Sequence, residues 1–266
     1  MRAERAPAQC CTICLNMTPE NAAAVEPEPS RMGVFSRIVG VFFEPAKTFR
    51  DIAERPTWIV PMILVILAII GVTTVMSQRI GWDRILRHQM ETNSRLQQMP
   101  AEQREQNLAV QEKFASVFGY VGALVGVPIY DLIAAAVLLG IAGGLMGGGM
   151  RFKQVFAVVS WSGLPGLVSA ILTVVVIFLK NPDDFNMQNP LAFNVGAFMD
   201  PNTSSKFVYS LAGSLDLFVF WTIFLMATGL KAAAGKKLTF NGALMAVLLP
   251  WAVVVLGKAA LAGAFS

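Results

Sequence analysis

The chain has 266 residues, of which 55% are hydrophobic and only 14% are charged, and its mean hydropathy is +0.58. Soluble domains contain about 25% charged residues and about 45–50% apolar ones. The composition, with its long apolar runs, therefore excludes a soluble domain, a disordered chain and a disulfide scaffold. The net charge of +4 comes from Arg and Lys spread through the loops. This distribution is typical of the flanks of membrane helices, and we expect no nucleic-acid partner.

The N-terminal segment, residues 1–31, is rich in Ala, Pro and Glu and has no hydrophobic centre. It is predicted to be a disordered tail without a cleavable signal peptide, and Met32 is an alternative start. Its cysteines, which include one C-x-x-C, are Cys10, Cys11 and Cys14. A structural zinc site needs four ligands, and the only histidine, His88, follows the first predicted span. We expect the cysteines to be incidental; the alternatives are a metal site completed by a second chain and acylated thiols.

Residues 32–57 form a more regular segment, in which apolar side chains recur at helical spacing. These side chains are Val34, Phe35, Ile38, Val39, Phe42 and Phe43. The pattern predicts a short amphipathic helix lying in the membrane interface. The alternative is a helix packed on the membrane spans, and the sequence favours neither.

Five apolar segments follow, and together they predict a membrane domain over residues 58–264. A hydrocarbon layer about 30 Å thick requires about 20 apolar residues in a helix. The segments that meet this requirement are 58–77, 118–146, 155–179, 207–230 and 243–264. The ten-residue alternation of a transmembrane β-barrel is absent. The sequence therefore predicts an all-α, polytopic membrane protein with five transmembrane helices.

Residues 78–117, between the first two spans, are polar and favour helices, with one break at Pro100. They predict a helical hairpin that projects from the membrane. Its charges are interpreted as a solvated face, with a partner-binding surface as the alternative.

The short loops between the later spans indicate the orientation. They contain no acid, and their basic residues are Arg151, Lys153, Lys231, Lys236 and Lys237. Because cytoplasmic loops carry an excess of Lys and Arg, the N-terminus is predicted to be cytoplasmic and the C-terminus to lie outside. The arginines of the projecting hairpin weaken this assignment.

An internal repeat is indicated by three pairs of landmarks, each 85 residues apart. The pairs are Asp131 and Asp216, Arg151 and Lys236, and Pro165 and Pro250. If the repeat is real, the second and third spans and the fourth and fifth spans are duplicated hairpins in the same orientation. Coincidence is the alternative, because few residues are identical.

Three ionisable residues lie inside predicted spans: Asp131, Asp216 and Lys258. Such residues are costly in a bilayer and suggest a function by default. Two carboxylates could serve a proton or cation route, and Lys258 could pair with Asp216. The alternative is that each aspartate is hydrogen-bonded to a neighbouring helix and that the lysine extends toward the surface.

Enzyme motifs are missing from the sequence. A chain with one histidine has neither H-E-x-x-H nor an intramembrane Ser–His pair, so we expect no catalytic residue, metal site or cofactor. Glycines recur at three- and four-residue spacings: Gly119, Gly122, Gly126, Gly140, Gly143, Gly144, Gly147, Gly148 and Gly149. They allow close helix contact, either within the chain or in a homo-oligomer.

Two stretches carry a resemblance to a known family, FFEPAKTFRDIAERPTWIVPMILV (42–65) and RFKQVFAVVSWSGLPGLV (151–168). They resemble bacterial members of the Yip family, the Ypt/Rab-interacting integral membrane proteins, over residues 34–264. The positions that carry the resemblance are Pro45, Thr48, Phe49, Pro56, Trp58, Pro61, Phe152, Phe156 and Pro165. The eukaryotic signature Asp-Leu-Tyr-Gly-Pro is absent.

The resemblance implies a five-span protein with no catalytic residues. We therefore expect a non-enzymatic protein of a bacterial inner membrane that organises the bilayer or recruits an unidentified protein partner. The alternative is a small transporter or ion channel that uses Asp131 and Asp216.

Overall fold

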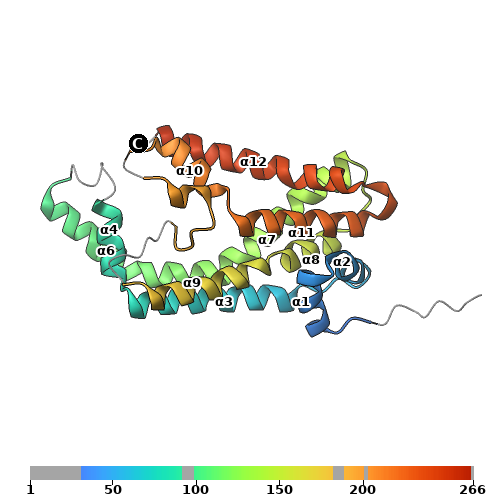
Figure 1. Cartoon of the computed structure of the whole chain (residues 1–266), viewed down its shortest axis with the longest axis horizontal. Helices are drawn as coiled ribbons and strands as arrows, with labels where there is room; N and C mark the ends of the chain where they lie inside the picture. Colours follow the sequence, from blue (N-terminus) through green and yellow to red (C-terminus); the bar gives the residue numbers. More distant parts are fainter. Residues whose placement is uncertain (1–30, 92–98, 182–188, 201–202, 265–266) are drawn as a thin grey trace, which may run out of the picture. The chain divides into compact units, whose positions relative to one another are not determined.

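The structure is a computed structural model of the chain, shown in Figure 1, and it describes residues 31–91, 99–181, 189–200 and 203–264. The chain divides into two units, 1–31 and 32–266. The predicted tail and its cysteines lie outside the described residues. Helices take up 83% of the described part, which contains no strand. The prediction of an all-α fold is confirmed.

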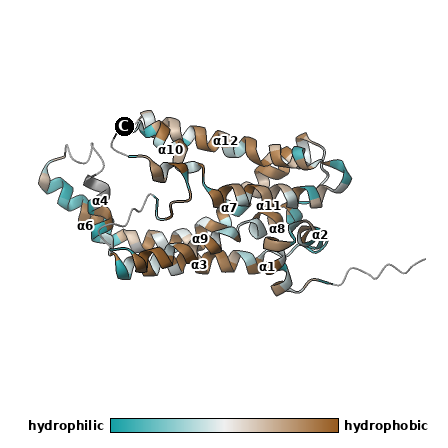
Figure 2. Ribbon diagram, viewed as in Figure 1, coloured by the Kyte–Doolittle hydropathy of each residue, from teal (hydrophilic) through white to brown (hydrophobic). Residues whose placement is uncertain are grey.

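Five helical segments are long and apolar enough to cross a membrane, which confirms the predicted number of spans. Their bounds are Ile59–Arg79, Ala101–Leu145, Phe152–Leu179, Leu217–Lys237 and Phe240–Ala264. Less than half of each apolar stretch is buried inside the protein. In Figure 2, brown hydrophobic residues run along α3 and α9, whereas α2 and the turn between α11 and α12 are teal. This surface needs hydrocarbon around it, because exposing it to water has a large free-energy cost.

Several spans are built from more than one helical element. The first span is α3 (Ile59–Arg79). The second combines α6 (Ala101–Val121), the π-helix η2 (Gly122–Gly126), α7 (Val127–Leu138) and the π-helix η3 (Leu139–Leu145). The third combines α8 (Phe152–Ser162) and α9 (Pro165–Leu179). The fourth is α11 (Leu217–Ala234) with the short η6 (Gly235–Lys237), and the fifth is α12 (Phe240–Ala264).

The two basic turns depend on glycines with positive φ. Gly149 has φ of 65° in the turn before α8, and Gly235 has φ of 62° in the turn before α12. Residues other than glycine rarely adopt a positive φ. Each turn therefore reverses the chain within a few residues, so that α7 packs on α8 and α11 packs on α12.

The fourth span differs from the prediction of one helix over 207–230. The structure has two helices there, α10 (Lys206–Ser214) and α11, separated at Leu215 and Asp216. Asp216 is the N-cap of α11, and its Oδ1 accepts hydrogen bonds from the N–H groups of Phe218 (2.8 Å) and Val219 (3.3 Å). Aspartate is among the preferred N-cap residues. The average hydropathy of an apolar segment does not show where a new helix begins inside it. This explains why one helix was predicted where the structure has two.

The extended backbone at this break pairs with the loop before it, which includes η5 (Val195–Phe198). The Val195 N–H donates to the carbonyl of Leu215 (3.3 Å), and the Leu217 N–H donates to the carbonyl of Phe193 (3.1 Å). These bonds satisfy backbone groups that the interrupted helix leaves open.

The hairpin predicted outside the membrane is present. It consists of α4 (Trp82–Glu91) and the first turns of α6, which begins directly after Pro100. Leu86 and Leu108 are buried between the two helices. Arg87 contacts Asp83 (2.8 Å) and Glu105 (3.4 Å). Residues 92–98, which connect the two helices, lie outside the described residues.

The largest core lies where spans two to five meet the segment before the first span. That segment forms α1 (Val34–Phe43) and α2 (Pro45–Glu54). Helix α11 packs against α2, α8 and α12, and α3 packs against α9. The largest side chains without exposed surface in this core include Trp161, Phe49 and Leu225. The segment before the first span is thus part of the packed bundle.

Candidate functional site

The segment 34–57 forms a structural unit that we call the N-terminal clamp. At its centre the Arg37 residue is 6% exposed, and its Nε contacts Asp51 Oδ2 at 2.6 Å. Nη1 of the same side chain donates to Thr57 Oγ1 (2.7 Å) and to the carbonyl of Arg55 (3.3 Å). The ion pair and these hydrogen bonds tie α1, α2 and the approach to α3 together.

Close packing also holds α1 on α2. A Cβ added at Gly40 would overlap the hydroxyl of Thr48, which itself donates to the carbonyl of Glu44 (3.0 Å). A side chain at Gly40 would therefore force either the Thr48 side chain or the two helices of the clamp to shift.

Two long-range hydrogen bonds attach the clamp to the third span. Trp161 Nε1 donates to the carbonyl of Thr57 (2.6 Å), and Gln154 Nε2 donates to the carbonyl of Ala53 (2.9 Å). Gln154 also caps α8, because its Oε1 accepts from the Arg151 N–H (2.9 Å). Both bonds end on clamp carbonyls, so the clamp has a defined position on α8.

The fourth span completes the attachment through Gly229. A Cβ added there would overlap Val158 of α8 and lie 2.9 Å from Phe49 Cδ1 of α2. Glycine is thus required for the close approach of α11 to both helices. Phe42 adds an edge-to-face contact with Trp221 of α11, with ring centroids 5.5 Å apart.

Most of the family-like positions lie in the clamp or against it. Those in α2 or in the link to α3 are Pro45, Thr48, Phe49, Pro56 and Trp58, and Pro61 lies in the first turn of α3. The Trp58 ring meets Phe156 edge-to-face at 5.3 Å, and Phe152 stacks on Phe156 at 5.9 Å. Pro165 instead begins α9. Most of the residues that carry the family resemblance therefore lie where the clamp joins the bundle.

Asp131 lies on α7 and is buried, with 6% exposure. Its Oδ2 accepts a hydrogen bond from Ser160 Oγ of α8 at 2.6 Å. The carboxylate borders a cavity of about 340 Å³, whose walls include Gly122, Gly126 and Gly163. No basic side chain in the described residues forms an ion pair with Asp131. π-Helical turns such as η2, just before it, are frequent at functional sites.

Asp216 and Lys258 do not form the pair that the sequence suggested. Among the ion pairs of the described residues none joins them, and Lys258 is exposed on α12. Lys258 lies on the outward face of α12, whereas Val255 and Ala259 of the same helix are buried on its inward face. From the outward face a lysine can extend toward the membrane surface. The structure therefore does not bring the three ionisable residues together.

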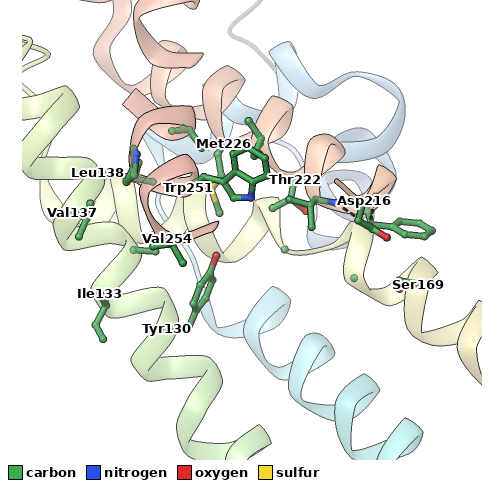
Figure 3. Close-up of a pocket in the computed structure, with 18 residues that line it drawn as sticks. Tyr130, Ile133, Val137, Leu138, Ser169, Asp216, Thr222, Met226, Trp251 and Val254 are labelled. Carbon is green, nitrogen blue, oxygen red and sulfur yellow. Dashed lines mark hydrogen bonds between the residues drawn. The ribbon is translucent and has the colours of Figure 1, made fainter. Parts of the chain in front are cut away.

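Asp216 borders a second cavity, of about 620 Å³, lined by α7, α9, α11 and α12. Figure 3 shows Asp216 and Ser169 toward one side of this cavity, with Thr222 and Trp251 next along it. Tyr130 borders both cavities. Among the described residues, no group of three or more His, Cys, Asp or Glu side chains could hold a metal ion.

Sequence reasoning missed the polar centre of the clamp. Arg37 lies among the apolar residues from which an amphipathic helix was predicted, and the structure buries it against Asp51 and Thr57. The available signal was a single arginine in a strongly apolar ten-residue stretch, followed within two turns of the next helix by an aspartate.

The five spans and their lipid-facing apolar surface define an all-α integral membrane protein. Residues 39–261 match the model of the Yip1 domain, and the chain belongs to this family. The resemblance to the Yip family is therefore confirmed, and it is a family of membrane proteins not known for enzymatic activity. Searches of curated proteins and of solved structures found no match.

Proposed function

We propose that this protein is a non-enzymatic membrane-organising protein whose helix α1 inserts into one leaflet of the bilayer. The observation that carries this proposal is the outward apolar face of α1. Phe35 and Phe43 are 79% and 81% exposed, and Val34 and Val39 lie exposed beside them. Large aromatic side chains in this position bind the boundary between head groups and acyl chains.

The buried face of α1 explains why this insertion would act on the membrane. Arg37 points into the protein and is held by Asp51, so the helix presents hydrocarbon outward from a fixed position. A rigidly held helix displaces lipids in one leaflet only, which favours curvature. Arg50 and Arg55 are exposed on the same segment, and near an anionic surface each basic residue adds about 1 kcal/mol of attraction. We place this face in the cytoplasm of a bacterial cell, at its inner membrane.

The test is the double variant Phe35→Ser with Phe43→Ser in liposomes that contain phosphatidylglycerol. Burying a Phe side chain contributes about 1.5–3 kcal/mol, so we expect the parent to narrow or tubulate the vesicles and the serine variant to lose this effect. Electron microscopy of vesicle diameters measures it. The Phe35→Leu with Phe43→Leu variant is the control and should retain remodelling. Equal remodelling by the serine variant and the parent would exclude the insertion mechanism.

A second candidate function is proton or cation passage, and one observation favours it. Asp131 is a buried carboxylate without a basic partner in the described residues, and its cavity shares Tyr130, Gly163 and Thr222 with the cavity that Asp216 borders. In proteoliposomes with a pH or cation gradient, this function predicts flux in the parent and its loss in Asp131→Asn with Asp216→Asn. An impermeable parent would eliminate this candidate.

A further inference from the structure

The 620 Å³ cavity lies between the two hairpins that the 85-residue repeat relates. Its 18 lining residues come from α7, α9, α11 and α12, and most of them are apolar. Six pairs among them are 85 positions apart, including Ala134 with Val219, Val137 with Thr222, and Ser169 with Val254. The two copies thus present the same helix faces to one space, which supports the repeat over coincidence.

None of these pairs is identical, and the pair with the largest difference in side-chain size creates room. Trp251 of α12 corresponds to Gly166 of α9. The indole occupies space on one side, where it also contacts the Phe220 ring at 5.6 Å. On the other side, a Cβ added at Gly166 would meet no atom within 4 Å. The cavity is open on the side where the repeat has glycine in place of tryptophan.

The surroundings determine what can fill this space. Ile133, Tyr130 and Val254 line the cavity and are also exposed, so the cavity opens to the outer surface of the spans. That surface faces hydrocarbon, where no water is present. An apolar cavity open to hydrocarbon is filled most favourably by an apolar chain.

One end of the cavity is polar. Asp216 Oδ1 accepts the two amide hydrogen bonds that cap α11. Its Oδ2 accepts no hydrogen bond from any residue in the described ranges, and Ser169 lies on the same side in Figure 3. A carboxylate oxygen with spare acceptor capacity complements a positively charged donor, and such charge-assisted hydrogen bonds are the strong ones.

The cavity is also long enough to hold part of an acyl chain. From Asp216 to Met226 the lining residues of α11 span about 15 Å at 1.5 Å per residue, which is half of the hydrocarbon thickness of about 30 Å. We infer that the cavity binds one acyl chain of a membrane lipid whose head group carries an ammonium, with the ammonium facing Asp216 and the chain lying between the two hairpins.

The experiment uses the full chain in nanodiscs with a photoactivatable phosphatidylethanolamine that carries a diazirine on one acyl chain. Phosphatidylglycerol with the same labelled chain is the second probe. After irradiation, mass spectrometry of peptides locates the labelled residues. We expect labels on α7, α9, α11 and α12 at the lining positions, and about tenfold more label from the ammonium lipid than from phosphatidylglycerol.

Gly166→Leu tests the cavity, because it adds a side chain on the open side, where a Cβ meets no atom within 4 Å. Its matched control is Gly257→Leu on α12, which also meets open space and does not line the cavity. We expect labelling of the lining residues to fall about tenfold in Gly166→Leu and to persist in Gly257→Leu. Labelling that persists in a folded Gly166→Leu protein would overturn the proposal.

Asp216→Asn tests the head group, and asparagine keeps the capping of α11. We expect the lining residues to stay labelled while the preference for the ammonium lipid disappears. Asp131→Asn, in the neighbouring cavity, should keep the preference. Equal labelling by both lipids in the parent would overturn the role of the ammonium. Helicity and elution volume confirm that each variant is folded.

Discussion

Arg37→Met is expected to lower the free energy of unfolding by about 3–5 kcal/mol. The substitution keeps an unbranched apolar stem but leaves the partly buried Asp51 carboxylate without its partner, and it removes the hydrogen bond to Thr57. Reversible unfolding in mixed micelles, followed by circular dichroism, measures the change. The same variant should be cleaved faster by trypsin after Arg55, because Arg37 no longer binds the Arg55 carbonyl and the backbone at the end of the clamp opens more readily.

Two further variants separate the ion pair from a general effect of losing a charge. Arg87→Met removes an arginine whose ion pairs in the projecting hairpin are exposed, with 49% of the arginine side chain accessible, and should leave stability unchanged within error. Arg37→Met combined with Asp51→Leu replaces both charges by apolar groups and should recover much of the loss. A double variant no more stable than Arg37→Met would show that the ion pair is not the source of the effect.

Gly229→Ala is expected to destabilise the protein by about 1–3 kcal/mol through overpacking. The new methyl group would overlap Val158 and press on Phe49, so α11 must move away from α8 and α2. The thermal midpoint in detergent, measured by intrinsic tryptophan fluorescence, reports the change.

The control for this variant is Gly257→Ala, which adds the same methyl group to a transmembrane helix where nothing lies within 4 Å. Alanine has a higher helix propensity than glycine, by about 1 kcal/mol, so the control should be unchanged or more stable. The two substitutions are thus expected to have opposite signs. A stabilised Gly229→Ala protein would mean that the close approach of the three helices is not required.

The spans could be predicted because length and hydropathy depend only on local sequence. The polar stretch around Pro100 predicted the projecting hairpin for the same reason. The break at Asp216 could not be predicted in this way, since one carboxylate that caps a helix changes the hydropathy of an apolar window only slightly. A residue that starts a helix by capping it is recognised from its hydrogen bonds.

The position of the clamp on the bundle could not be predicted from the sequence pattern. Helical periodicity identifies an apolar face, but it does not say whether that face meets protein or lipid. In α1 the answer is both, because Phe42 meets Trp221 whereas Phe35 and Phe43 are exposed. The 85-residue repeat stays a prediction, and it is supported by pairs such as Val137 and Thr222 that line one cavity.

The hydrogen bonds that seat the clamp also determine when it can form. Their partners are separated by 101 and 104 residues, from Ala53 to Gln154 and from Thr57 to Trp161. At synthesis rates of about 5–20 residues per second, the third span emerges roughly 5–20 seconds after the clamp. Until then the first helices of the chain have no docking surface on α8. The apolar face of α1 therefore reaches its final position only late in biogenesis, once the helices that hold it have entered the membrane.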